Sequence, residues 1–192
     1  MSRLYKQMVV QNLSNRDIIF KNFRGEARQY NEAGRRNFCL CLDDPKAIYK
    51  YGVPEREDVF NVGDPAQLAE FIGILQADGF NLKSTPERDG YPSRPYMKVN
   101  LAFDKGTPPA IYMLNSLNRP IPVGVEFMEK LDGNLIEKAD IHFTPYNYDE
   151  NGNAQSAWLR TMYFQLANTD PFANLYPREI DTGDEVPEMP FN

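Results

Sequence analysis

The chain has 192 residues, of which 42% are hydrophobic, 12% aromatic and 25% charged, enough for one globular domain with a sizeable core and no need for stabilising cross-links. The formal net charge is −6, which at first argues against a function in binding polyanions. However, five acids lie beyond residue 178, which leaves 22 acids against 21 bases in residues 1–178. The sequence therefore predicts a nearly neutral body followed by an acidic tail.

The first predicted strands span residues 17–23 and 36–42, both short and rich in branched or aromatic side chains. In the second strand, the two-residue period places Phe38 and Leu40 on the core face. Cys39 and Cys41 alternate within the same strand, where a disulfide is geometrically poor, and two thiols are too few for a zinc site. We expect reduced packing residues and hence a reducing compartment.

The clearest predicted helix begins after Asp64, a typical N-cap, with Pro65 in its first turn and Gly79 as its stop signal. The preceding segment, 44–63, has no role that the sequence assigns. After the helix, residues 80–83 are predicted as a short strand and 84–95 as a mobile loop. The apolar stripe of the helix consists of Leu68, Phe71, Ile72 and Leu75.

The alternation in residues 96–103 predicts a half-buried strand, and residues 110–114 are predicted as its hairpin partner. Residues 124–132 should form a short second helix. The last two strands, 139–148 and 155–166, are predicted as a hairpin because the segment between them contains Asn-Gly.

These elements predict a mainly β protein, an OB-fold-like, partly open antiparallel barrel with one main inserted helix and a short second helix. A β-sandwich is the alternative, because patterning does not distinguish closure from stacking. We expect an OB-fold domain over residues 1–177 and a disordered acidic tail over 178–192. No apolar run approaches about 18 residues, and the start lacks a secretory signal, so we expect a cytoplasmic protein with no membrane partner.

Signals for catalysis are few. His142 is a lone strand residue, and Asp43-Asp44 precedes Pro45 as a turn would. The sequence contains no glycine-rich phosphate loop and no cluster of metal ligands. We therefore expect no enzymatic activity, no cofactor and no metal.

A binding role is better supported, first by a basic loop between residues 23 and 37. Guanidinium groups bind phosphates and aromatic rings stack on bases, and a surface that holds unpaired strands needs both. An ordinary solvated loop is the alternative. The candidate residues of this loop are Arg24, Arg28, Tyr30, Arg35 and Arg36.

The pairing of an aromatic ring with a cation recurs on two predicted strands, and two further tyrosines lie beside the last hairpin. Core packing or strand propensity explains each ring singly. The recurrence beside basic residues favours a nucleic-acid surface. The candidates are Tyr96 with Lys98, Trp158 with Arg160, and the tyrosines Tyr146 and Tyr148.

The acidic tail ends on apolar residues, which a purely solubilising segment does not need. Such a segment can be steered to a basic surface and then anchored in a pocket, so we expect it to compete with DNA or to recruit a protein partner. A frayed terminus is the alternative. The acidic tail resembles that of bacterial single-stranded DNA-binding proteins. Their tail ends at Pro-Phe, whereas this chain adds Asn192. The candidate docking residues are Asp184, Glu185, Glu188, Met189, Pro190 and Phe191.

Five short motifs in order resemble the single-stranded DNA-binding proteins of tailed bacteriophages and prophages, over roughly residues 17–176. The resemblance implies an OB-fold that coats single strands during replication or recombination in the host cytoplasm, with Arg36, Trp158 and Arg160 in its signature positions. Thr144 stands where a basic residue is expected, and the insert at 44–63 is a second departure. The motifs are Arg36-Asn-Phe38, Ala77-Asp-Gly-Phe-Asn-Leu-Lys83, Tyr96-Met-Lys-Val99, Ala139-Asp-Ile141 with Pro145-Tyr146, and Ala157-Trp-Leu-Arg-Thr-Met-Tyr163.

Two other functions remain open from the sequence. The surface aromatics are also compatible with a phage structural or adaptor protein that makes protein–protein interfaces. An enzyme acting on nucleic acid would require metal-binding carboxylates grouped in space. The four arginines between residues 24 and 36 argue against the structural or adaptor protein.

Overall fold

The computed structural model describes residues 6–104, 106–148 and 154–167, and this part of the chain is mainly β. Eleven strands, two α-helices and one 3-10 helix are found there. In chain order they are β1 (Gln7–Leu13), β2 (Ile18–Asn22), β3 (Arg36–Cys41), β4 (Ile48–Val53), β5 (Arg56–Phe60), α1 (Pro65–Ala77), β6 (Lys83–Ser84), β7 (Pro95–Leu101), β8 (Ala110–Leu114), β9 (Pro120–Pro122), α2 (Val125–Met128), η1 (Leu131–Gly133), β10 (Ile136–Tyr148) and β11 (Ala154–Leu166).

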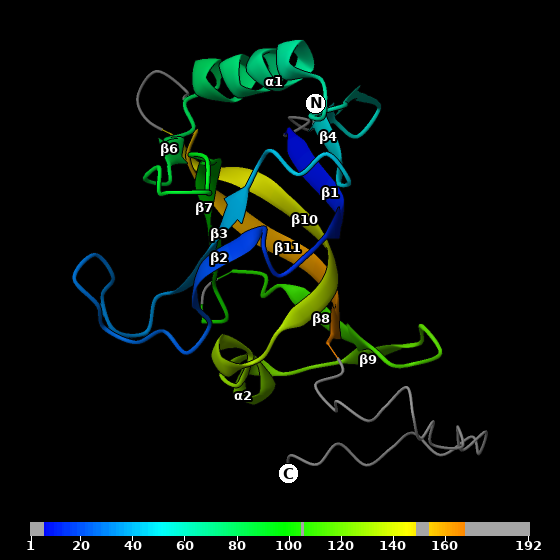
Figure 1. Cartoon of the computed structure of the whole chain (residues 1–192). Coiled ribbons are helices and arrows are strands. Elements are labelled where there is room, and N and C mark those ends of the chain that lie inside the picture. Colours follow the sequence, from blue (N-terminus) through cyan, green and yellow to red (C-terminus); the bar gives the residue numbers. More distant parts are fainter. Residues whose placement is uncertain (1–5, 105, 149–153, 168–192) are drawn as a thin grey trace.

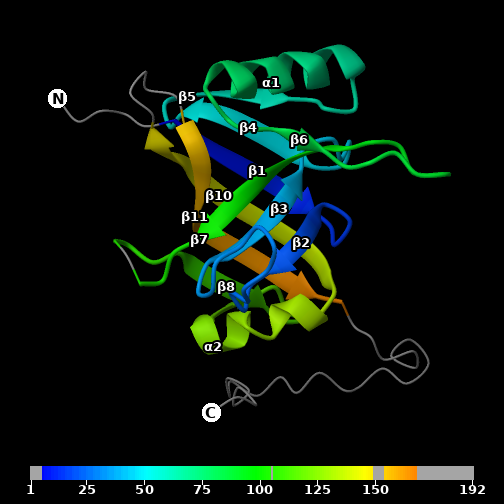
Figure 2. The ribbon, with the colours of Figure 1, turned by 90° about the vertical axis from the view of Figure 1, so that its left-hand side faces the viewer.

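The sheet curls into an OB-fold-like, partly open barrel with the strand order β2-β3-β7-β11-β10-β1 (Figures 1 and 2). The first and last strands of this path, β2 and β1, are consecutive in the chain and are joined by residues 14–17. No ladder of hydrogen bonds is found between β1 and β2, so the barrel is closed at this point by the chain itself. The predicted pairing of the last two strands is confirmed, since β10 and β11 run antiparallel along nearly their whole length.

The predicted hairpin between residues 96–103 and 110–114 is wrong. β7 and β8 both pair with β11 and run parallel to it, β7 at Ala157–Trp158 and β8 farther along at Thr161–Phe164. β11 has 13 residues, so its edge is long enough for two short strands in succession. β8 instead forms its hairpin with β9. The barrel is thus antiparallel except along one edge of β11.

The predicted helix is confirmed as α1, which covers one end of the barrel (Figures 1 and 2). The Asp64 carboxylate accepts a hydrogen bond from the Ala66 N–H at 2.9 Å, and Gly79 follows the helix with a φ of +91°. Phe71 is fully buried and stacks on Phe60 of β5, with the ring centroids 4.7 Å apart. The helix is therefore held by the core as well as by its caps.

The segment 44–63, which the sequence left without a role, forms β4 and β5 and extends the sheet beyond β1. Three of its aromatic side chains enter the core: Tyr49, Tyr51 and Phe60 are all at most 6% exposed. The predicted strand at 80–83 is shifted, because β6 covers only Lys83–Ser84 and Phe80 turns into the core against Tyr51. The segment 44–63 therefore extends the sheet and packs against α1, through the contact of Phe60 with Phe71.

Two short helices, α2 and η1, close the other end of the barrel (Figure 1). A single helix over 124–132 was predicted here. Asp132 of η1 accepts hydrogen bonds from the backbone N–H groups of Phe23 and Arg24, at 2.8 and 3.1 Å. The start of the basic loop is therefore fixed to this end of the barrel.

The two cysteines of β3 are reduced and buried, as the sequence predicts. Burial raises the pKa of Cys39 to about 11, against the opposing charges of Lys98 and Lys83, and burial raises the pKa of Cys41 to about 12. Both thiols are therefore protonated at neutral pH and act as packing groups. In the described residues, no helix is long and apolar enough to span a membrane.

Candidate functional site

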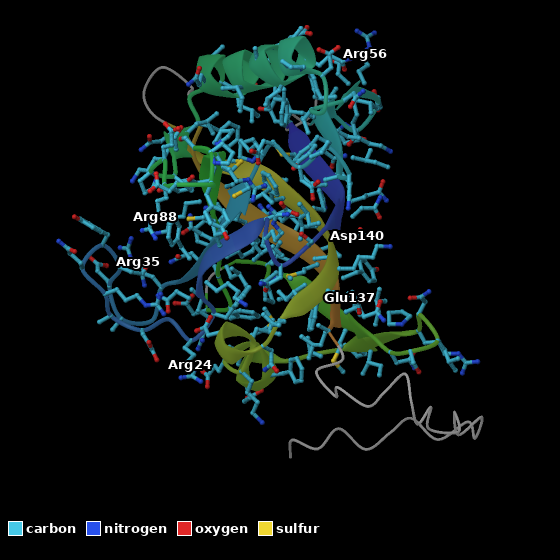
Figure 3. The ribbon with its side chains drawn as sticks, in the orientation of Figure 1. Arg24, Arg35, Arg56, Arg88, Glu137 and Asp140 are labelled. Atoms are coloured by element: carbon cyan, nitrogen blue, oxygen red, sulfur yellow. The ribbon has the colours of Figure 1, made fainter. Side chains whose placement is uncertain are left out.

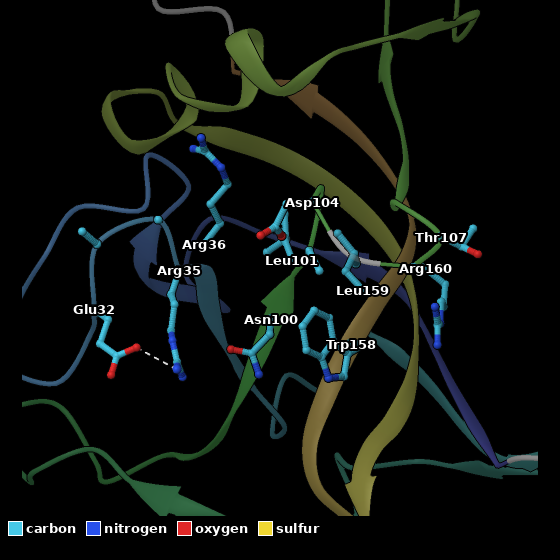
Figure 4. Close-up of a pocket in the computed structure, with 14 residues that line it drawn as sticks. Glu32, Arg35, Arg36, Asn100, Leu101, Asp104, Thr107, Trp158, Leu159 and Arg160 are labelled. Carbon is cyan, nitrogen blue, oxygen red and sulfur yellow. Dashed lines mark ion pairs between the residues drawn. The ribbon is translucent and has the colours of Figure 1, made fainter.

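Two adjoining cavities lie on the outer surface of β3, β7 and β11, beneath the basic loop. The cavity over β11 has a volume of about 820 Å³ and the cavity over β7 about 440 Å³. Asn100 lines both, so the two form one surface that we call the groove. Figure 4 shows the cavity over β11. Its size is in the range of pockets that hold small organic groups.

The floor of the groove is a row of residues in register across neighbouring strands. Asn37 of β3 lies opposite Asn100 of β7, and Asn100 lies opposite Trp158 of β11. Beyond the groove the row continues to Thr144 of β10, which lies opposite Trp158. Side chains alternate along a strand, so apolar residues next to this row point into the core. Val99 of β7 and Phe143 of β10, for example, are fully buried. The alternation thus separates a groove face from a core face.

The cavity over β11 combines one indole ring with three arginines: Arg35, Arg36 and Arg160. Trp158 is half-buried beside them. The register between β10 and β11 shifts between His142 and Phe143, which pair with Thr161 and Leu159. Arg160 is therefore the extra residue of a β-bulge and has no cross-strand partner on β10. Its Nε donates a hydrogen bond to the Thr144 hydroxyl at 2.8 Å. The bulge therefore directs Arg160 outward beside the ring of Trp158.

The cavity over β7 is lined by the other predicted aromatic-cation pair, Tyr96 and Lys98. Arg28 and Tyr30 from the loop also line it. Tyr30 is 86% exposed. Phe20 of β2 also lines this cavity, and its ring meets that of Tyr96 edge to face, with the centroids 5.5 Å apart. Three aromatic rings with accessible surface therefore lie within one cavity.

The groove is positively charged although the whole chain is negative. Among its lining residues are six cationic side chains, against two carboxylates, Glu32 and Asp104, both in the cavity over β11. Such a local field attracts polyanions regardless of net charge. The cations are Arg28, Arg35, Arg36, Lys83, Lys98 and Arg160.

Several of these arginines also make contacts within the protein. Arg35 pairs with Glu32 at 2.7 Å, but both side chains are largely exposed, so the pair contributes little stability and can open. Arg36 is only 17% exposed and pairs with Glu129 of the α2 end at 2.9 Å. Its Nη1 donates to the Phe23 carbonyl. Arg36 therefore holds the loop to the barrel and leaves less of its charge for a ligand.

Arg24 is the predicted site residue that the structure places outside the groove. Its Nε donates to the Glu129 carbonyl at 2.9 Å, and Figure 3 shows it beside α2, whereas Arg35 lies farther out on the loop. Its position indicates an anchoring role at the base of the loop.

Eight of the eleven predicted binding residues line the groove, and these eight come from the loop, β3, β7 and β11. Tyr146 and Tyr148 belong to β10, but their side chains lie outside the described residues. The six predicted docking residues of the tail also lie outside them. The eight are Arg28, Tyr30, Arg35, Arg36, Tyr96, Lys98, Trp158 and Arg160.

The sequence missed Phe20, Lys83 and Asn100. Strict alternation in β2 would bury Phe20 together with Ile18 and Asn22, but Phe20 has a φ of +49° and is 58% exposed. The register of β2 against β3 shifts at this point. Nothing in the sequence signals that bulge. Asn100 could have been found, because it follows Tyr96 and Lys98 on the outer face of β7.

His142 and the acidic pair Asp43-Asp44 make hydrogen bonds within the protein. His142 is half-buried with its Nε2 3.0 Å from the Gln7 side-chain oxygen, and burial, helped by Arg160, lowers its pKa. It is therefore neutral at pH 7. No group of three or more potential metal ligands occurs within the described residues.

When the chain is compared with protein-family models, with curated proteins and with solved structures, none of the three comparisons gives a match.

Proposed function

We propose that this protein binds single-stranded DNA without strong sequence preference and without catalysis. The observation that carries the proposal is the convergence of cations and aromatic rings in one groove, from segments far apart in the chain. Cations hold the backbone phosphates, and each ring offers a stacking surface that any base can use. On the resemblance of its motifs, the protein would coat single strands during phage replication or recombination in the host cytoplasm.

The groove is better suited to unpaired strands than to duplexes. In a duplex the faces of the bases are stacked on each other, so rings such as Trp158 and Tyr96 have nothing to stack on. A flexible single strand can lay its phosphates along Lys98 and Arg160 while its bases turn onto the rings. We therefore expect duplex DNA to bind more weakly than a single strand of the same length.

The direct test is a titration with single-stranded oligonucleotides at several salt concentrations. Trp158 is the single tryptophan of the chain, so stacking of a base on it should quench the intrinsic tryptophan fluorescence. Each phosphate ion pair contributes about −0.7 to the slope of log K against log salt, and the six groove cations set a limit near −4. The proposal fails if single strands at low salt cause neither quenching nor a change in anisotropy.

The same titration separates the alternative functions. An adaptor that uses its aromatics for protein contacts would show no salt-dependent affinity for oligonucleotides. A nuclease would shorten a labelled single strand when magnesium is added. Intact oligonucleotides after such an incubation, together with salt-dependent binding, support the non-catalytic proposal.

The acidic tail is proposed to compete with DNA for the groove and to recruit replication or recombination proteins. Removing residues 178–192 deletes five acids, so we expect the truncated protein to bind single strands more tightly, most clearly at low salt where charge is least screened. The measurement is the Kd of the truncated and full chains at two salt concentrations. Equal or weaker binding by the truncated chain would contradict competition.

A further inference from the structure

Asn100 occupies the one position of the groove that lines both cavities. It lies on β7 directly opposite Trp158 of β11, and Figure 4 shows the amide beside the indole ring. The Asn100 side chain is half-buried, so its orientation is restricted while its polar atoms face the groove. A base that stacks on Trp158 would bring its edge to this amide.

Neighbouring asparagines of the same groove are already engaged by the protein. Asn22 exchanges two hydrogen bonds with the backbone of Glu26, and Asn37 donates to Asn31 at 2.6 Å. These amides shape the basic loop. In contrast, none of the hydrogen bonds found among the described residues uses the side chain of Asn100. Its amide therefore has donors and an acceptor to offer to a ligand.

The chemistry of the amide selects a base edge rather than a phosphate. Phosphates are drawn to the cations on either side, such as Lys98 and Arg160, whereas a neutral amide provides no charge for them. Base edges carry neutral donors and acceptors, which an amide can match, and a half-turn of its plane exchanges its donor and acceptor. This contact would add affinity while tolerating different bases.

We propose that Asn100 hydrogen-bonds the edge of the nucleobase that stacks on Trp158. The proposal rests on the proposed binding of single-stranded DNA, and it adds a polar base contact to a surface otherwise made of charges and rings. One net hydrogen bond corresponds to an affinity change of about three- to tenfold. The loss should depend on the presence of bases and leave the salt dependence unchanged.

The experiment compares Asn100→Leu with the unmodified protein on two probes of about 15 nucleotides, oligothymidylate and an abasic strand with the same backbone. Leucine keeps the size of the side chain and removes its hydrogen bonds. We expect binding of oligothymidylate to weaken by about three- to tenfold and binding of the abasic strand to change by less than about twofold. Gln76→Leu on the exposed face of α1 is the matched control and should change neither.

Two further measurements keep the test decisive. The slope of log K against log salt should be the same for Asn100→Leu as for the unmodified protein, whereas Lys98→Met should reduce it by about 0.7. Asn100→Ala should reproduce the pattern if leucine lowers the melting temperature. Equal losses on both probes, or no loss on either, would overturn the base contact. If the unmodified protein binds neither probe at low salt, the proposed function itself is wrong.

Discussion

Replacing Trp158 by alanine should weaken the binding of single-stranded DNA by about 10- to 100-fold, because stacking on an aromatic side chain is worth about 1–3 kcal/mol per base. The ring lies on the groove floor, half-buried between β7 and β10, so it is already oriented before a strand arrives. Such preorganisation avoids an entropic cost on binding. The measurement is the anisotropy of a labelled oligonucleotide, since the variant has no tryptophan signal.

Tyr163 provides a matched control on the same strand. It is 37% exposed and stacks on Tyr112, with the ring centroids 4.9 Å apart, but it does not line the groove. Tyr163→Ala should therefore bind DNA as well as the unmodified protein does, whatever it costs in stability. Trp158→Phe, which retains a ring, should recover most of the lost affinity. Full affinity in Trp158→Ala would remove the central support for the proposed function.

Replacing Arg94 by methionine should lower the free energy of unfolding by about 3 kcal/mol or more, because it leaves a buried carboxylate without its cation. Arg94 donates to Asp17 and Asp43, each at 2.8 Å, and to the Arg16 carbonyl at 2.7 Å. Asp17 is 1% exposed. The arginine thus joins the β1–β2 connection to the end of β3 and the start of β7. For a chain of this size the melting temperature should fall by roughly 6–12 °C.

The pH dependence of this loss provides an independent check. Burial opposes ionisation of Asp17, but hydrogen bonds from Asp44, Arg94 and Ser14 outweigh it and lower its pKa below the usual value. A lowered pKa contributes stability at pH values above the unfolded pKa of about 4, and this contribution is lost as the pH falls through the folded pKa. The destabilisation by Arg94→Met should therefore be larger at pH 7 than at about pH 3.

Urea unfolding of both proteins at the two pH values measures this difference. Arg56→Met is the matched control, since Arg56 is an exposed residue of β5 and its loss should cost less than about 0.5 kcal/mol. A destabilisation by Arg94→Met that is equally small, or that grows as the pH falls, would contradict the assigned role of the Asp17–Arg94–Asp43 network.

Local patterns were sufficient to predict much of the groove. The alternation of β7 placed Tyr96 and Lys98 on the outer face, and the same period placed Trp158 and Arg160 together on β11. This succeeds because adjacent side chains of a strand point to opposite faces whatever the strand pairs with. Phe20 was missed because a single residue with positive φ inverted the expected face of β2.

The basic loop shows where residue type alone is insufficient. Its arginines were indistinguishable in the sequence, yet Arg24 and Arg36 bond to the α2–η1 end of the barrel, while Arg28 and Arg35 pair with the loop's own carboxylates. Which arginines are engaged depends on where Glu129 and Asp132 lie in space. Those positions are set by a segment about a hundred residues away in the chain.

The sequence by itself determined the β-rich class, the start and end of α1 and the aromatic-cation pairs, because caps, periodicity and alternation act between residues close in the chain. Only the tertiary structure decided that β8 runs parallel to β11, that the insert at 44–63 carries α1, and that Asn100 lies opposite Trp158. Strand partners are chosen by the burial and hydrogen bonding of the whole sheet, so distant segments compete for the same edge.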